Sequence, residues 1–388
     1  MTTLAFILIV LPIALFMYSY FLYPALLWIG GRFRRASQYP ADLPEWPRIS
    51  ISLPAYNEER SIRRTLDTLL NLDYPADRRQ ILVISDASSD RTDEIVKEYA
   101  GHGVQLIRLP ARGGKTAAEN AAGPHLTGDI VINTDATIRI LPDALKPLIR
   151  VFQDQEIGVA SGRDLSVGDI TTEANQGESG YVGYEMSVRR METRLGGIVG
   201  ASGCFYAIRR ELHTSLFPEA LSRDFASALI SKEHGYRSVS VDEAVCLVPR
   251  ANSLQSEFRR KVRTMARGLD TLWYKKRLLN PFQFGGFAFK LLSHKLCRWL
   301  VFLTIPGAVA GLAILAPVSQ VARVLLGVTI AGSIAGMLAM KASERGPVPR
   351  IVSMWAFLFA ANLAGILAWV KAFRGERNPI WEPTRRPA

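Results

Sequence analysis

The sequence predicts an α/β domain with a mainly parallel sheet, flanked in the chain by transmembrane helices. Apolar residues make up 48% of the 388 residues, and they crowd into residues 4–30 and 296–372. Between these two regions, short apolar segments alternate with amphipathic ones. Such alternation is typical of strands and helices in a parallel sheet that is covered on both faces.

The first apolar run, Leu4–Ile29, is long enough to cross a hydrocarbon core of about 30 Å as a helix. A signal peptide begins with basic residues, whereas here Arg32, Arg34 and Arg35 follow the run. Basic residues beside a span stay on the cytoplasmic side. The run is therefore expected to anchor the chain with the middle of the sequence inside.

The second apolar region holds candidate spans at about 299–317, 321–340 and 351–370, and the aromatic stretch Phe282–Leu292 before them suits an interfacial helix. With one span before the domain and three after it, the C-terminus would lie outside the cell. The basic tail favours a C-terminus on the cytoplasmic side, so both topologies stay open. The expected organisation is an anchor at 1–31, a linker at 32–48, an α/β domain at 49–275, interfacial helices at 276–298, transmembrane segments at 299–372 and a basic tail at 373–388.

The formal net charge of +12 comes largely from basic residues that flank the apolar runs. Membrane flanks explain that charge better than nucleic acid does, and no nucleic-acid partner is expected. Three separated cysteines form neither a disulfide framework nor a zinc site, which favours a reducing compartment for the middle of the chain.

Four strands are expected in the first part of the domain, with helices between them. The strands are Ile49–Leu53, Ile81–Ser85, Val104–Leu109 and Ile130–Asn133, and the helices lie near Ser61–Leu70, Thr92–Ala100 and Thr116–Ala122. Ligands of parallel sheets bind beyond the carboxyl ends of the strands. Polar segments that follow the strands are therefore the candidate site.

The first two strands end in Pro54-Ala55-Tyr56-Asn57-Glu58 and in Ser85-Asp86-Ala87-Ser88. Helix-capping chemistry would explain these residues equally well. In the functional interpretation, Asp86 accepts hydrogen bonds from a nucleotide base or ribose. The following Arg112-Gly113-Gly114-Lys115-Thr116 is no P-loop, since Leu109 stands where that motif needs glycine, but Lys115 can still lie near a ligand.

Two further aspartates are candidates for chemistry. Asp135 follows the fourth strand, and a carboxylate beside a diphosphate suits Mn²⁺ or Mg²⁺, although a lone aspartate can equally be a turn residue. Asp224 precedes an amphipathic helix, where it either caps the helix or acts as a general base. The glycines of Gly200–Gly203 suit a loop whose backbone approaches a ligand.

Arg260, Arg263 and Arg267 share one face of a predicted helix. The arginines could face anionic lipid, or they could neutralise a diphosphate, which arginine binds through two parallel hydrogen bonds.

Taken in order, these motifs resemble glycosyltransferase family 2, in its membrane-embedded branch with cellulose, chitin and hyaluronan synthases. The resemblance spans about residues 49–275 and implies a GT-A fold, a nucleotide-diphosphate sugar donor and a divalent metal. It matches Asp135 to the first aspartate of the D-x-D motif, Asp224 to the catalytic base, and Arg260 to the arginine of Q-x-x-R-W, with Arg263 beside it at the diphosphate. The nucleotide-binding residues that it implies, together with the lysine of the glycine turn, are Ala55, Tyr56, Glu58, Asp86 and Lys115.

The chain departs from the family pattern at several positions. Thr137 takes the second D-x-D position, Ala87 replaces a usual glycine, and Arg223 stands where an acid is common. Glu257 and Lys261 take the Gln and Trp positions of Q-x-x-R-W. Because that tryptophan lies by the acceptor in processive synthases, a non-processive or short-product transferase is expected.

The resemblance thus implies inverting, metal-dependent transfer from a UDP-hexose or UDP-N-acetylhexosamine to a glycan or lipid-linked acceptor. The expected location is the cytoplasmic face of a bacterial inner membrane. Alternatives are a processive polysaccharide synthase, a nucleotidyltransferase, and a degenerate membrane scaffold or transporter component. A nucleotidyltransferase would carry a glycine-rich basic loop after the first strand, where this chain has Pro-Ala-Tyr-Asn-Glu. A transporter would carry polar residues inside its spans, and the spans of this chain hold almost none. The oligomeric state is left open.

Overall fold

The computed structural model describes residues 2–34, 39–40, 42–167, 174–214, 216–249, 253–346, 348–377 and 380. Its centre is a sheet in the order β3-β2-β1-β4-β7-β6-β8-β5. The strands are β1 Ile49–Ala55, β2 Arg79–Ser85, β3 Val104–Arg108, β4 Ile130–Thr134, β5 Arg139–Ile140, β6 Ile157–Val167, β7 Phe205–Arg209 and β8 Arg237–Pro249. The first four are parallel to one another, β7 is antiparallel to β4 and β6, and β8 is parallel to β6. The predicted α/β class with a mainly parallel sheet is confirmed.

Side chains that alternate along the strands build a core on each face of the sheet. On one face Ile51 of β1 and Val83 of β2 pack against apolar residues of α3, α4 and α6. On the other face Ile84 of β2 and Val131 of β4 pack against α5, α8 and α9. These helices are α3 Ile62–Leu70, α4 Thr92–Glu98, α5 Lys115–Ala122, α6 Leu145–Arg150, α8 Arg210–His213 and α9 Arg223–Glu233.

The sequence located β1 to β4 within a few residues, but the second half of the sheet was not predicted. The loop expected at Gly200–Gly203 is present, but the residues after it, Phe205–Arg209, form the buried strand β7, which was not predicted. Strands β6 and β8 carry polar residues on one side and pair with strands distant in sequence. Local periodicity does not reveal such pairing.

Four helical segments are apolar and long enough to cross a membrane: Thr2–Gly31, Pro281–Leu315, Gln320–Arg345 and Arg350–Arg374. The first comprises α1 Thr2–Met17, a π-turn and α2 Tyr23–Gly31; the second comprises α11 Pro281–Leu291, a π-turn and α12 Cys297–Leu315; the last two are α13 and α14. The expected interfacial stretch and the first C-terminal span are thus one helical segment, with a kink at Gly285. Most of the predicted basic tail lies outside the described residues.

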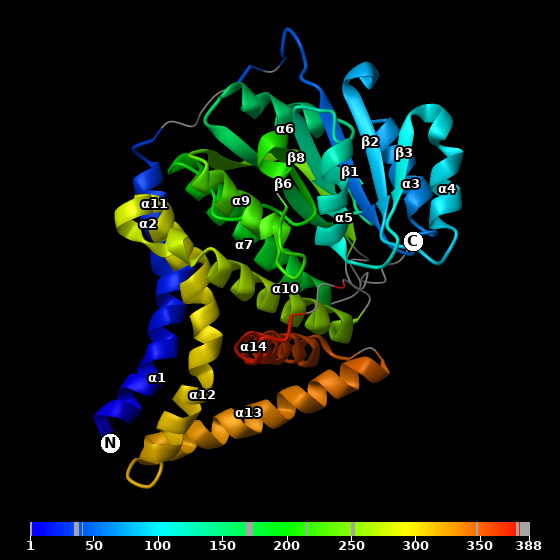
Figure 1. Cartoon of the computed structure of the whole chain (residues 1–388). Helices are drawn as coiled ribbons and strands as arrows, with labels where there is room; N and C mark the ends of the chain where they lie inside the picture. The colour runs from blue at the N-terminus through cyan, green and yellow to red at the C-terminus, as the bar shows by residue number, and fades with distance from the viewer. Residues whose placement is uncertain are drawn as a thin grey trace.

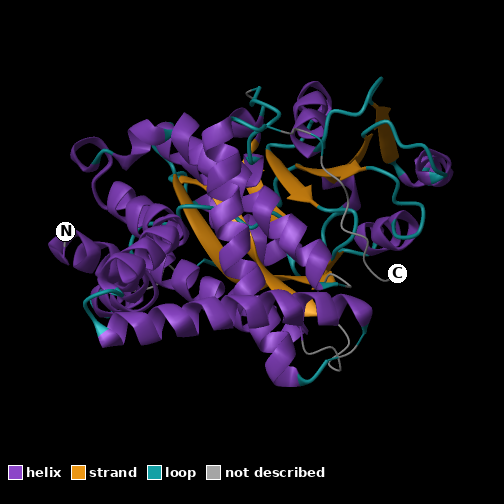
Figure 2. Cartoon of the chain, turned by 90° about the horizontal axis from the view of Figure 1, so that it is seen from below, coloured by secondary structure: helices purple, strands orange, loops and turns teal. Residues whose placement is uncertain are grey.

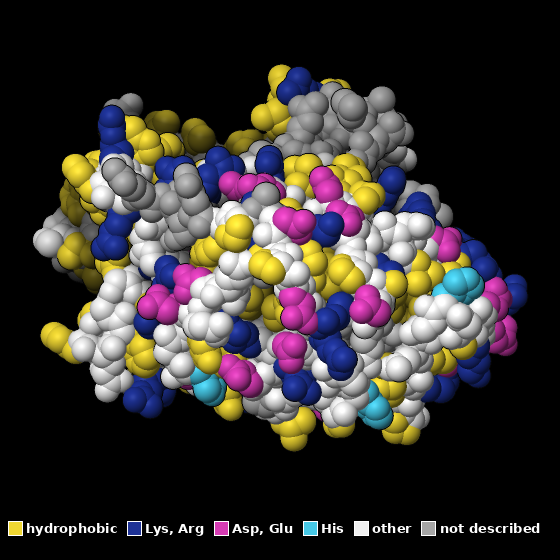
Figure 3. All heavy atoms as spheres, turned by 90° about the horizontal axis from the view of Figure 1, so that it is seen from above, with side chains coloured by type: hydrophobic (Ala, Val, Ile, Leu, Met, Phe, Trp, Pro, Cys, Tyr) yellow, Lys and Arg dark blue, Asp and Glu magenta, His cyan; other side chains and the backbone are white. Residues whose placement is uncertain are grey.

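The apolar helices lie on one side of the domain, and α10 Leu254–Tyr274 lies between the sheet and α14 (Figures 1 and 2). Ala266 and Leu269 of α10 pack against Ala368 of α14. The opposite face of the domain carries acidic and basic side chains interspersed (Figure 3). The molecule therefore has one face suited to water and, away from it, the helices suited to lipid.

Candidate active site

The loops after β1 and β2 are joined by reciprocal hydrogen bonds. The backbone N–H of Ser89 donates to Asn57 Oδ1 at 2.8 Å, and that of Glu58 donates to Thr92 Oγ1 at 2.8 Å. Asn57 and Ala87 both adopt positive φ, at 53° and 56°. Such backbone angles are costly for side-chain-bearing residues and are often found at functional sites. The two strand ends therefore form one pre-shaped rim.

Three of the predicted nucleotide-binding residues, Ala55, Tyr56 and Glu58, lie in this rim. Glu58 is buried and accepts a hydrogen bond from Ser61 Oγ at 2.5 Å. The Tyr56 ring lies under the guanidinium of Arg112, with 3.8 Å between the guanidinium carbon and the ring centroid. Arg112, to which the sequence analysis gave no role, thus brings the glycine turn over the end of β1.

The buried carboxylate of Asp86 holds that glycine turn. Its Oδ1 accepts from the N–H of Gly113 at 2.7 Å and its Oδ2 from the N–H of Gly114 at 2.9 Å. Gly114 has φ of 91°, and a Cβ at Gly113 would lie 2.7 Å from Ala117 Cβ, so both positions need glycine. Each carboxylate oxygen keeps a second lone pair. Asp86 can therefore fix the turn and still accept from a nucleotide.

Lys115, at the start of α5, connects three parts of the site. Its ammonium donates to Asp135 Oδ1 at 2.6 Å and to the carbonyl oxygen of Gly203 at 2.8 Å. Burial lowers the pKa of Lys115, but Asp135, Glu119 and Asp224 outweigh it and raise that pKa above the usual value. Lys115 is therefore a charged link between the end of β4 and the loop before β7.

Asp224 lies in the first turn of α9, beside the same loop. Ser222 Oγ donates to its Oδ1 at 2.5 Å, and a Cβ on Gly203 would lie 2.5 Å from its Oδ2. Lys115 thus links the predicted metal ligand Asp135 to the carbonyl oxygen of Gly203, and the predicted base Asp224 lies beside the same glycine. The roles of these residues stay predictions; their proximity is a structural fact.

Arg223, which stands where the family commonly has an acid, is buried beside this cluster. Its guanidinium donates to Asn120 Oδ1 and to the carbonyl oxygen of His213. His213 in turn contacts Asn133 Oδ1 at 3.0 Å, and burial together with Arg223 holds the pKa of His213 well below its usual value. Arg223 therefore joins α5, α8 and α9 through polar contacts behind the site.

The arginine face of α10 divides into two parts. Arg260 pairs with Glu257 through two hydrogen bonds of 2.9 and 2.6 Å. Arg267 donates to the Leu221 carbonyl oxygen at 2.6 Å and to Thr116 Oγ1 at 3.1 Å, so it supports the segment just before Asp224. Helical periodicity predicted that the three arginines share a face, but it could not show which of them contacts the segment before Asp224. Arg260 and Arg263 remain predicted diphosphate ligands.

The sequence did not point to a further buried acidic residue, Asp164, which lies in the second half of β6. Ser202 Oγ lies 2.6 and 2.7 Å from its two oxygens, and burial raises the pKa of Asp164. Asp135 is close enough to contribute to that shift. No sequence signal marked Asp164, since β6 itself was not predicted.

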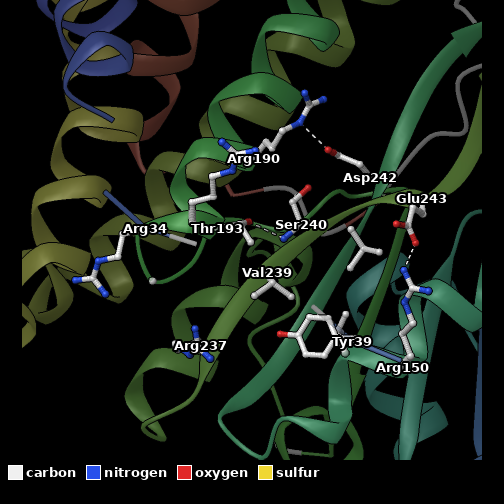
Figure 4. Close-up of a pocket in the computed structure, with 14 residues that line it drawn as sticks. Arg34, Tyr39, Arg150, Arg190, Thr193, Arg237, Val239, Ser240, Asp242 and Glu243 are labelled. Carbon is white, nitrogen blue, oxygen red and sulfur yellow. Dashed lines mark hydrogen bonds and ion pairs between the residues drawn. The ribbon is translucent and has the colours of Figure 1, made fainter. Parts of the chain in front are cut away.

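A cavity of about 630 Å³ lies apart from this cluster, between the linker, α6, α7 (Ala174–Arg194) and β8 (Figure 4). Three of the arginines that line it are already paired: Arg150 with Glu243, Arg190 with Asp242 at 2.6 Å, and Arg237 with Asp154 at 2.7 Å. The lining residues in the described part of the chain include none of the strand-end acids. Size alone therefore does not identify the reactive site.

The Asp135 position fits a divalent cation. Its carboxylate already holds a cation, the Lys115 ammonium, and is 19% exposed. Among the described residues, no cluster of three or more His, Cys, Asp and Glu side chains forms a closed metal cage. One carboxylate with the oxygens of a diphosphate is a usual donor set for Mg²⁺ or Mn²⁺. The residues present therefore suit a metal that arrives with its phosphate ligand.

Comparison with known proteins identifies the family of the domain. Residues 50–217 match the model of glycosyl transferase family 2. A probable glycosyltransferase, YdaM of Bacillus subtilis, is 37% identical over 127 residues, covering 30% of this chain and 30% of that protein. A beta-monoglucosyldiacylglycerol synthase of Trichormus variabilis is 29% identical over 188 residues, covering 47% of this chain and 40% of its own length. The chain thus matches less than half the length of these relatives.

A solved structure shares the whole architecture. The mannosyltransferase PcManGT from Pyrobaculum calidifontis, in complex with GDP-Man and Mn²⁺, has a TM-score of 0.73 and 23% identity, covering 95% of this chain and all of that one. The fold is that of the GT-A glycosyltransferases. Residues 50–217, which the family model matches, form a glycosyltransferase family 2 domain.

Proposed function

We propose that this chain transfers a sugar from a nucleotide-diphosphate sugar to an acceptor at the cytoplasmic face of the membrane, with inversion and with the help of Mn²⁺ or Mg²⁺. The observation that carries the proposal is the Lys115 link between Asp135 and Gly203, with Asp224 on the other side of that glycine. The proposed metal ligand and the proposed base thereby lie together beyond the carboxyl ends of the strands. The proposed reaction uses the metal at the departing diphosphate and the base at the acceptor hydroxyl.

The residues divide the work between donor and acceptor. Ala55, Tyr56, Glu58 and Asp86 bind the nucleoside at the rim, and Asp135 would hold the metal beside the diphosphate. A bound metal would supply charge neutralisation to the departing diphosphate. Lys115, Arg260 and Arg263 add positive charge there. Asp224 takes the proton of the acceptor hydroxyl as its oxygen attacks the anomeric carbon.

The residue next to the proposed base contacts an apolar helix, which favours an acceptor that resides in the bilayer. Phe225, next to Asp224, packs edge to face on Trp299 of α12 with 5.8 Å between centroids. Lys295, one turn earlier, lies 3.5 Å from where a Cβ on Gly200 would be. A lipid or lipid-linked hydroxyl could thus approach Asp224 along the helix. A relative named for diacylglycerol glycosylation supports the same acceptor class.

The location proposed is a bacterial inner membrane with the domain in the cytoplasm. Four apolar helical segments and the basic residues after the first of them support this. Lys261, in place of the acceptor-side tryptophan, contacts the Phe357 ring of α14 at 4.1 Å. Because a lysine packed on α14 stands where processive synthases have the tryptophan, single or short-product transfer is favoured over processive synthesis.

The test is turnover with purified protein in nanodiscs. A panel of UDP- and GDP-sugars is offered with Mn²⁺ and either diacylglycerol or a soluble glycan, and release of nucleoside diphosphate is measured. One sugar nucleotide should be consumed, faster with the lipid acceptor. Asp224→Asn should bind that donor normally and lose about 10²–10⁴-fold in rate. Equal loss of donor binding would make Asp224 a structural residue, and no consumption of any donor would refute the proposal.

A further inference from the structure

Glu119 on α5 is a buried carboxylate in an unusual position. It is 1% exposed, and within the described part of the chain no hydrogen bond reaches either carboxylate oxygen. Burial raises its pKa, Lys115 and Arg223 oppose that rise, and Asp224 and Asp135 add to it. A desolvated carboxylate without a donor gains strongly from any cation that reaches it.

Lys115 is the cation best placed to reach Glu119. The two residues are four apart on the same helix, so their side chains share one face. At present the Lys115 ammonium is engaged by Asp135 and by the Gly203 carbonyl oxygen. Two other cations are near. Arg223 already donates to Asn120 and to His213, and Arg267 donates to Thr116 and to the Leu221 carbonyl oxygen.

A metal on Asp135 would compete with that ammonium for the carboxylate. Both are cations, and the Lys115 nitrogen lies only 2.6 Å from Asp135 Oδ1. A buried ammonium that loses its carboxylate partner is costly unless a second one replaces it.

We propose that Glu119 is a positioning residue that receives the Lys115 ammonium when a divalent cation takes Asp135. The inference rests on the proposed function, since it assumes that Asp135 holds the metal. Without the Glu119 carboxylate, the Lys115 ammonium has no second partner, so the conformation in which it has left Asp135 is less populated. The apparent affinity for the metal then falls by the same factor as that population.

The experiment measures Mn²⁺ binding rather than turnover. Free Mn²⁺ is followed by its EPR signal in nanodiscs, in the presence of whichever of UDP and GDP the wild type binds better. Glu119→Gln should weaken Mn²⁺ binding about tenfold while thermal unfolding stays close to wild type. Glu119→Leu serves as a second variant without the charge, and Glu94→Gln, an exposed change on α4, is the matched control with no effect.

A double-mutant cycle separates action through Lys115 from direct attraction of the metal. In a Lys115→Met background, adding Glu119→Gln should leave Mn²⁺ binding unchanged. An equal tenfold loss in both backgrounds would show that Glu119 acts by its own charge and would overturn the inference. No effect of Glu119→Gln in the wild-type background would overturn it as well. If the wild type binds no Mn²⁺ with either nucleotide, the metal site of the proposed function fails first.

Discussion

Gly203→Ala tests the close contact between the proposed base, Asp224, and the backbone of Gly203. The new Cβ would lie 2.5 Å from Asp224 Oδ2 and 3.5 Å from its carboxyl carbon. The carboxylate is bound on its other side by Ser222, and the Gly203 carbonyl oxygen is held by Lys115 at 2.8 Å. Neither group can yield without breaking a charge-assisted hydrogen bond.

The size of the effect follows from the distance. Non-bonded contact needs about 3.5 Å, so Asp224 or the loop must move by about 1 Å. A displacement of about 1 Å in a catalytic group can cost about 10²-fold in rate. Crowding of this kind destabilises a fold by about 1–3 kcal/mol, which this domain should tolerate. The variant should therefore fold, bind donor and turn over about a hundredfold more slowly.

The assay is nucleoside diphosphate release at saturating donor, beside donor binding and thermal unfolding of the same preparation. Gly101→Ala is the matched control, because a Cβ at that position meets nothing within 4 Å. A Gly203→Ala protein with wild-type turnover would refute the close placement of Asp224. A variant that fails to bind donor would show that the loop serves the nucleotide rather than the base.

Four further outcomes are expected. Asp135→Asn should abolish Mn²⁺- or Mg²⁺-dependent transfer while the fold stays intact; full activity, or activity in excess chelator, would contradict this. Arg260→Lys should lower donor affinity or turnover about 10–100-fold if the guanidinium binds diphosphate, whereas an anionic-lipid role predicts matching curves in the same lipid. Ala87→Gly should raise the free energy of unfolding by up to about 1 kcal/mol in chemical denaturation, since φ there is positive. Folding lowers the pKa of His213, so as pH falls through about 6.5 the unfolded state binds a proton that the folded state does not, and the free energy of unfolding should decrease. His213→Gln should reduce this pH dependence, measured by thermal unfolding at several pH values.

The part of the fold that the sequence predicted is the part whose signals are local. Strands β1, β2 and β4 are short and mostly buried, β3 is a short edge strand, and amphipathic helices separate them, so composition and periodicity suffice. Strand β7 is equally buried, but it pairs antiparallel with β4 across more than seventy residues of chain. Nothing in its own five residues distinguishes a ligand loop from a strand.

The same distinction applies to the site. Asp86, Lys115, Asp135 and Asp224 were found because each follows a strand or begins a helix, where carboxyl edges gather ligands. Asp164 was missed because its strand was missed. Glu119 was missed because an unpartnered carboxylate is a property of the surroundings: its helix spacing from Lys115 is visible in sequence, whereas its burial is not.

The contacts around Asp224 connect the membrane helices to the chemistry. The Ser222 N–H donates to Thr271 Oγ1 at 2.9 Å, and Arg267 supports the residue before it, so α10 holds the base loop from below. Helix α10 in turn packs on Ala368 of α14. If α14 spans the membrane as proposed, a movement of this helix would reach the proposed base Asp224 through two packed layers. Bilayer composition is thus expected to alter turnover even for donor and acceptor that are themselves soluble.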